Sequence, residues 1–289
     1  MIASFVSPRG TASTMLQYGF YNMIANWPVL ALRICVTLLT VFIGTLLTAK
    51  IGFSVFDLST FNVHTLDLLK QRNMLGILMV LALVVMVGAA ALAVDSYVSA
   101  ASVRVYLQAQ NAALVALPHR SLAVFRVFRF WEWNAAGRAS WWRLFQVKLV
   151  TGLSTLILVA PFAVFGIENA GKHPGILAFG CISIVVLPIP LIRVALWGLK
   201  AEVVCIAVPE ASVRETLRAG WSVLMANYRV HLVTALIVAL IAIAVGVLFA
   251  AGVHRFGVAE PISHAATKAL STVLLCWLVA SFVALTERA

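Results

Sequence analysis

Apolar residues are gathered into six long blocks along the chain, separated by shorter polar stretches. Each block has roughly 20 residues, the length that an α-helix needs to cross a hydrocarbon core of roughly 30 Å. The pattern therefore predicts six transmembrane helices, paired as three hairpins. The predicted spans are residues 28–49, 74–96, 147–167, 174–195, 230–253 and 265–285, with Pro161, Pro188 and Pro190 expected as kinks inside two of them.

The composition leads to the same fold class. Hydrophobic residues make up 63% of the 289 positions and charged residues 11%, and the mean hydropathy is +1.03. Soluble domains are about half apolar and a quarter charged, so a water-soluble fold could not bury this much apolar surface. We expect an all-α integral membrane protein that forms one membrane domain over residues 1–289.

The distribution of positive charge predicts the orientation of the helices. The chain has 21 Lys and Arg residues against 10 acidic residues. With the N-terminus in the cytoplasm, six basic residues fall on the outer side, namely Lys50, Lys70, Arg72, Lys172, Arg255 and Lys268, and the other 15 fall inside. The positive-inside rule therefore predicts cytoplasmic N- and C-termini. Topology accounts for the basic charge, so no nucleic-acid partner is expected.

A sequence repeat connects the two ends of the chain. Residues 16–29 (LQYGFYNMIANWPV) align with residues 217–230 (LRAGWSVLMANYRV), and each copy immediately precedes a predicted span. The identical pairs are Leu16 and Leu217, Gly19 and Gly220, Ala25 and Ala226, Asn26 and Asn227, and Val29 and Val230. The stretch 141–145 before the third span matches these copies only in its aromatic and basic character. The repeat is therefore either twofold or threefold.

The repeat divides the chain into membrane hairpins and cytoplasmic segments. Ser212 and Glu215 have the spacing of a capping box, which predicts a helix start before the second copy. That amphipathic helix either lies in the membrane interface or extends the fifth span. The expected segments are 1–27 (interfacial), 28–103 (hairpin 1), 104–146 (aromatic and basic cytoplasmic loop), 147–200 (hairpin 2), 201–229 (interfacial helix) and 230–289 (hairpin 3).

Residues suited to chemistry do not converge in the sequence. The six histidines have no metal-ligand spacing, the four cysteines stand alone, and no nucleophile elbow or phosphate-binding glycine loop occurs. We therefore expect no enzyme activity, no metal and no cofactor. Arg33 and Asp95 are predicted at similar depth near the cytoplasmic ends of their spans. They form either a structural ion pair or two separate side chains that reach the headgroups, and the second alternative is favoured.

Aromatic and basic residues are interleaved on the predicted cytoplasmic face. This combination is typical of contact with anionic headgroups and of protein interfaces. The expected partners are membrane lipids, including anionic ones, together with subunits of a membrane complex or further copies of the chain. The candidate contact residues are Arg126, Arg129, Trp131, Trp133, Trp141, Trp142, Arg214, Arg218 and Trp221.

The repeated motif resembles a group of bacterial six-helix inner-membrane proteins. They are the YciC-like proteins and the membrane domain attached to some glycerophosphodiester phosphodiesterases. The residues that carry the resemblance are Ser212, Arg214, Thr216, Leu217, Gly220, Trp221, Ala226, Asn227 and Tyr228, with an N-terminal echo at Gly19, Phe20, Ala25, Asn26, Trp27 and Pro28. The resemblance implies the architecture and a bacterial inner-membrane location. The chain has no room for the phosphodiesterase domain, so that activity is not expected.

Two functions are compatible with these features. The first is a non-enzymatic membrane protein that organises lipids or partner subunits of a membrane complex, because the aromatic and basic residues lie on a surface. The alternative is a transporter or export accessory for an apolar or lipid-like solute, because paired hairpins and helix-kinking prolines are features of transporters.

Overall fold

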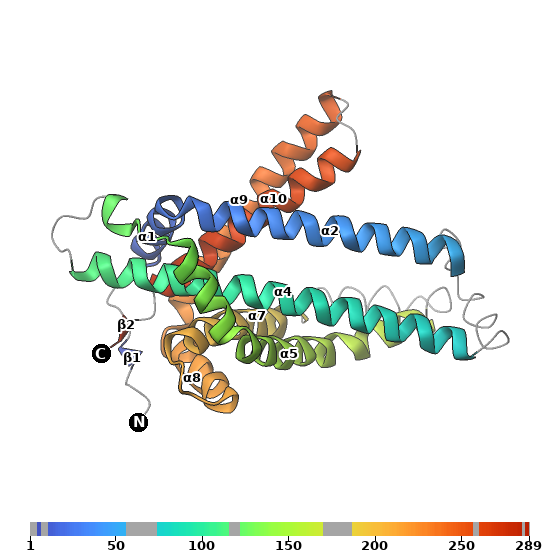
Figure 1. Cartoon of the computed structure of the whole chain (residues 1–289), viewed down its shortest axis with the longest axis horizontal. Helices are drawn as coiled ribbons and strands as arrows, with labels where there is room; N and C mark the ends of the chain where they lie inside the picture. The colour runs from blue at the N-terminus through green and yellow to red at the C-terminus, as the bar shows by residue number, and fades with distance from the viewer. Residues whose placement is uncertain are drawn as a thin grey trace.

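A computed structural model describes residues 5–6, 11–55, 74–115, 122–169, 187–256, 260–284 and 287–288. Apart from two short strands, the regular elements of these residues are helices (Figure 1). In chain order they are β1 Phe5–Val6, α1 Ala12–Ala25, α2 Trp27–Val55, α4 Met74–Val115, the 3-10 helix η2 Leu122–Phe125, α5 Phe130–Asn169, α7 Pro188–Ala207, α8 Val213–Ala226, α9 Tyr228–Phe256, α10 Glu260–Ala284 and β2 Glu287–Arg288.

Five of the described helices are long and apolar enough to cross a membrane, namely α2, α4, α5, α9 and α10. The chain thus has the helices of a multi-pass α-helical membrane protein. Much of the predicted fourth span, residues 174–186, lies outside the described residues. Among the described residues, α7 begins at Pro188, so Pro188 and Pro190 lie in its first turn. Proline fits there because the first backbone N–H groups of a helix have no intrahelical acceptor. The kinks predicted at these prolines involve residues outside the described ones.

The helices on either side of the predicted cytoplasmic loop are longer than expected. α4 continues to Val115 and α5 already starts at Phe130, so most of residues 104–146 is helical. The prediction of a loop was wrong because it ended the second span near Asp95, whereas the apolar pattern of α4 runs from Ala82 to Leu114. The added helical turns carry much of the buried core.

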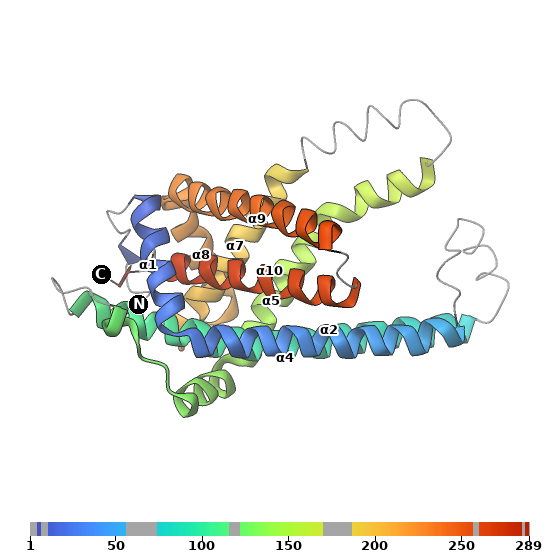
Figure 2. The ribbon, with the colours of Figure 1, turned by 90° about the horizontal axis from the view of Figure 1, so that it is seen from above.

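Both ends of the chain lie at the same end of the molecule. β1 pairs with β2 in antiparallel register, with Phe5 opposite Arg288 and Val6 opposite Glu287. Figure 1 shows α1 and α8 at this end as well, and we call it the near end. The opposite end, toward which α2, α4 and α5 extend, is the far end (Figure 2).

The buried core is concentrated at the near end. The largest fully buried side chains include Tyr106, Phe125, Leu144, Leu224 and Phe282, from five different elements. α10 is the central helix of this region, since it contacts α1, α2, α4, α7 and α9. Among the described residues, the last buried side chain toward the far end is Arg33 on α2, Ser96 on α4 and Val147 on α5. Past these positions, the described side chains of the three helices are half-buried or exposed. The hydrophobic surface there is left to face lipid.

Candidate functional site

The two copies of the sequence repeat dock in the same way on different helices. The indole N–H of Trp277 on α10 donates to the backbone carbonyl of Leu16 over 2.9 Å. The indole N–H of Trp197 on α7 donates to the carbonyl of Leu217, also over 2.9 Å. Leu16 and Leu217 are equivalent in the repeat, so α1 sits on α10 as α8 sits on α7.

The glycine of each copy allows this close approach. A Cβ added at Gly19 would lie 2.7 Å from Ser281 Cα, and one added at Gly220 would lie 2.8 Å from Ala201 Cα. Ser281 and Ala201 each follow their docking tryptophan by four residues, which is about one helical turn. Glycine is required at both positions because the obstructing atoms belong to the backbone of the neighbouring helix.

The structure reveals a third copy of the docking unit at the start of α5. The hydroxyl of Tyr97 on α4 contacts both oxygens of Asn134, the side-chain oxygen at the shorter distance and the backbone carbonyl at 3.2 Å. Asn134 precedes Gly137 by three residues, as Leu16 precedes Gly19. A Cβ at Gly137 would lie 2.8 Å from the Tyr97 ring, so the glycine here accommodates the aromatic residue itself.

The pattern of burial is shared by the three copies. The equivalent residues Met15, Trp133 and Thr216 are all buried. The outward positions are exposed in every copy, namely Ser13, Gln17, Phe20 and Ile24 on α1; Trp131, Ala135, Arg138 and Trp142 on α5; and Arg214, Arg218, Trp221 and Met225 on α8. Three helical segments therefore present corresponding faces at the near end.

The third copy escaped the sequence comparison because it lacks the asparagine. α1 and α8 end at Asn26 and Asn227, which cap their last turns, whereas Leu144 stands at the equivalent position in α5 and the helix continues. Asn26 is fully buried and also holds the segment before α5. Its amide N–H donates to the Phe125 carbonyl over 2.7 Å, and its side-chain oxygen accepts the N–H of Phe128 over 3.1 Å.

Most of the predicted contact residues lie on the exposed surface of the near end. The indole side chains of Trp131, Trp142 and Trp221 are 80%, 54% and 43% exposed. We use the name aromatic–basic rim for the exposed members of the set, which are Arg126, Arg129, Trp131, Trp142, Arg214, Arg218 and Trp221. Trp133 is 6% exposed and packs in the core, so it is not part of this surface. Trp141 is half-buried beside Trp142.

A second group of polar residues lies between the helices. Arg33 Nη2 of α2 lies 3.8 Å from Asp95 Oδ1 of α4. Lys148 of α5 forms an ion pair with Asp95, and its Nζ lies 3.6 Å from Glu202 Oε2 of α7. Ser99 joins the group, accepting hydrogen bonds from Arg33 over 3.1 Å and from Lys148 over 2.9 Å. We call Arg33, Asp95, Ser99, Lys148 and Glu202 the charged cluster.

The charged cluster links four helices with two cations and two carboxylates. The structure brings Arg33 and Asp95 together, and adds Lys148 and Glu202, which the sequence did not single out. The exposed fractions of the side chains are 6% for Arg33, 11% for Lys148, 15% for Glu202 and 52% for Asp95. Arg33 Nη1 is buried and has no hydrogen-bond partner among the described residues.

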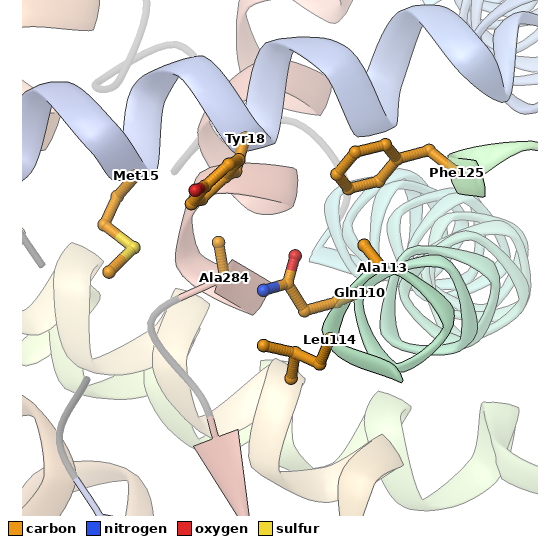
Figure 3. A pocket seen from close by; sticks show the side chains of 7 residues that line it. All are labelled: Met15, Tyr18, Gln110, Ala113, Leu114, Phe125 and Ala284. Atoms are coloured by element: carbon orange, nitrogen blue, oxygen red, sulfur yellow. The ribbon is translucent and has the colours of Figure 1, made fainter. Parts of the chain in front are cut away.

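A small cavity at the near end is lined by α1, α4, η2 and the end of α10 (Figure 3). Its volume is about 30 Å³, which is room for about one water molecule. Gln110 extends into it from α4 toward Ala284, below Tyr18, and the buried Gln110 Oε1 has no hydrogen-bond partner within the described part of the chain.

The fold and these sites define a multi-pass helical membrane protein with a repeated docking unit, an aromatic–basic rim and an internal charged cluster. No protein-family model, curated protein or solved structure matches the chain. Within the described residues, no group of three or more His, Cys, Asp or Glu side chains is arranged to hold a metal ion.

Proposed function

We propose that this chain is a non-enzymatic membrane protein that organises lipids at the near end through the aromatic–basic rim, and that anionic lipids are its main ligands. The observation that carries this proposal is the outward face of α8, where Arg214 and Arg218 lie beside Trp221. Tryptophan side chains favour the headgroup level of a bilayer, and each arginine near an anionic surface adds about 1 kcal/mol of attraction.

The capping of α8 supports its role as a rigid interfacial element. Ser212 accepts the backbone N–H of Glu215, and the Glu215 carboxylate accepts the N–H of Ser212 over 2.8 Å. Trp197 then holds the helix from the membrane side. Since both its start and its inner face are held in place, α8 presents its arginines without a large loss of conformational freedom.

The proposal is tested by the lipids that accompany the full-length protein. The protein would be extracted into native nanodiscs and the ratio of phosphatidylglycerol to zwitterionic lipid compared with that of the surrounding membrane. We expect enrichment of the anionic lipid, reduced in Arg218→Gln and lost in Arg214→Gln/Arg218→Gln. Arg104→Gln is the matched control, because Arg104 is an exposed arginine of α4 outside the rim. Equal lipid ratios in wild type and in the double variant would contradict the proposal.

The same rim suits a protein partner, a further copy of the chain or a subunit of a membrane complex. Large exposed aromatic residues beside arginine are typical of interface hot spots. A partner that co-purifies with wild type and is lost in Trp131→Ala would assign this part of the rim to a protein contact.

A transporter or export accessory for an apolar or lipid-like solute is the second candidate. The charged cluster favours it, because ionisable residues within membrane-spanning helices mark substrate pathways more often than structural sites. A flux assay with the reconstituted protein and a labelled phospholipid tests it, and absence of protein-dependent movement would remove this candidate.

We further propose a bacterial inner-membrane location with the near end in the cytoplasm. The resemblance to YciC-like proteins supports the location, and the excess of basic residues near this end supports the orientation. The rim would then face the inner leaflet.

A further inference from the structure

The charged cluster lies inside the membrane-spanning helices and apart from the rim. Arg33 follows Trp27 by six residues, which places it about 9 Å further along α2. Trp27 is 60% exposed and marks the near-end interface of that helix. Asp95 lies within the apolar stretch Ala82–Leu114 of α4. The cluster therefore lies where the buried core of the near end meets the lipid-facing parts of α2, α4 and α5.

Polar side chains continue from the cluster toward the far end. Thr37 and Thr40 share the face of α2 that carries Arg33, and Thr151 and Thr155 share the face of α5 that carries Lys148. The hydroxyl of Thr272 on α10 lies 3.4 Å from that of Thr37. Thr40, Thr151, Thr155 and Thr272 also donate to carbonyls of their own helices, so they satisfy their hydrogen bonding without a ligand.

Two features of the cluster suit a further partner. Asp95 is paired with Arg33 and Lys148, yet half of its side chain stays exposed in an otherwise apolar stretch, where a charged group is costly. Arg33 Nη1 is a buried, charged donor without an acceptor among the described residues. A ligand that matches both must bring a cation to Asp95 and an acceptor oxygen to Arg33.

The surroundings of the cluster indicate an amphiphile. Toward the far end, α2 exposes Leu39, Phe42 and Ile43, and α9 exposes Leu240 and Ile243. Figure 1 shows the α9 and α10 pair diverging from α2 and α4 in that direction. Acyl chains can pack on these side chains while a charged headgroup reaches the cluster.

We propose that the charged cluster binds one phospholipid whose headgroup carries both a phosphate and a primary ammonium group. The ammonium group pairs with Asp95, the phosphate accepts from Arg33, and the acyl chains extend toward the far end. Since the two carboxylates and two cations of the cluster balance, a zwitterionic headgroup leaves the site neutral. The proposal does not depend on the rim, which attracts anionic lipids.

The test uses the detergent-solubilised full-length protein and native mass spectrometry. The probes are phosphatidylethanolamine, phosphatidylcholine, phosphatidylglycerol and diacylglycerol with identical acyl chains. We expect wild type to retain one phosphatidylethanolamine per chain at concentrations about tenfold below those needed for the other three, because a hydrogen-bonded charge pair is worth a factor of that size. Phosphatidylcholine is the sharpest comparison, since its quaternary ammonium cannot donate hydrogen bonds.

Variants separate this site from the rim and from a purely structural cluster. Asp95→Asn should lose the preference for phosphatidylethanolamine and Asp95→Glu should keep it, while Glu210→Gln, which changes an exposed acid elsewhere, should behave as wild type. Arg218→Gln should lower only the retention of phosphatidylglycerol. Equal retention of all four probes by wild type, or an unchanged preference in folded Asp95→Asn, would show that the cluster only joins helices. If Asp95→Asn fails to fold, the retention of the four lipid probes by the wild-type protein still tests the proposal.

Discussion

At the residue scale, the most telling positions are polar groups whose partners lie far away in the sequence. Asn26 is an example, because the repeat drew attention to it but gave no sign that it binds residues 125–128. The sequence could suggest an ion pair between Arg33 and Asp95, because both are predicted at a similar depth in their spans. Lys148 and Glu202 could not be added, since the packing of α5 and α7 against α4 cannot be read from hydropathy.

Replacing Asn26 should destabilise the near end. Asn26→Ala removes the bonds to the Phe125 carbonyl and the Phe128 amide and leaves buried backbone groups unpaired, which costs about 1–3 kcal/mol per group. We expect a lower unfolding temperature in detergent, measured by intrinsic tryptophan fluorescence. Gln17→Ala, on the exposed face of the same helix, is the control and should have almost no effect. An Asn26→Ala protein as stable as wild type would remove the assigned role.

Glu215 should make the start of α8 sensitive to acid. Hydrogen bonds from Ser212 hold the pKa of the Glu215 carboxyl below its ordinary value of 4.5. Because the folded-state pKa is depressed, the stabilisation is present above the ordinary value and is lost as the pH falls through the folded-state pKa. After correction for the pH dependence of intrinsic exchange, the protection of the Glu215 and Thr216 amides should therefore fall on acidification in wild type. In Glu215→Gln the protection of the same amides should not show this loss, because glutamine has no carboxyl group to titrate.

At the element scale, a short helical segment leads into a long membrane helix three times. Two of the three units were predicted from sequence because they share Gly, Ala-Asn and Val at fixed spacing. For the third, the sequence showed only the aromatic and basic stretch 141–145 and left a threefold repeat open, because Arg143 and Leu144 replace Ala-Asn. Of the shared residues, the third unit keeps only Gly137 and Val147. These two matches can be recognised as part of the repeat only when the burial pattern is known.

The docking glycines should tolerate no side chain. Gly220→Ala would force a Cβ into the backbone of α7, and overpacking of this kind costs about 1–3 kcal/mol. Gly19→Ala should act similarly at α10. Gly88→Ala is the matched control, since no atom lies within 4 Å of its Cβ position. Thermal unfolding in detergent compares the three variants, and equal stability of all of them would mean that the helices are not held this closely.

At the scale of the whole molecule, composition was enough to predict a multi-pass helical membrane protein. It could not predict where the protein core lies, because lipid-facing and protein-facing residues are equally apolar in the spans. The core gathers at the near end instead, where the helices extend beyond the length that a bilayer requires.

The proposed orientation predicts the outcome of reporter fusions. A reporter that is active only in the cytoplasm should work when joined after Ala289 and fail when inserted near Asn62 or Lys172. The reason is the bias of basic residues toward the near end. A cytoplasmic signal from Lys172 together with an external signal from Ala289 would reverse the orientation and place the rim on the outer leaflet.

The docking of α1 on α10 also has a consequence for biosynthesis. Leu16 on α1 and its partner Trp277 on α10 are 261 residues apart, so α1 leaves the ribosome long before α10 is made. Until then, the glycine face of α1 has no native surface to cover it. Closure of the near end must therefore follow the synthesis of α10, and α1 has to wait for a partner from the same chain.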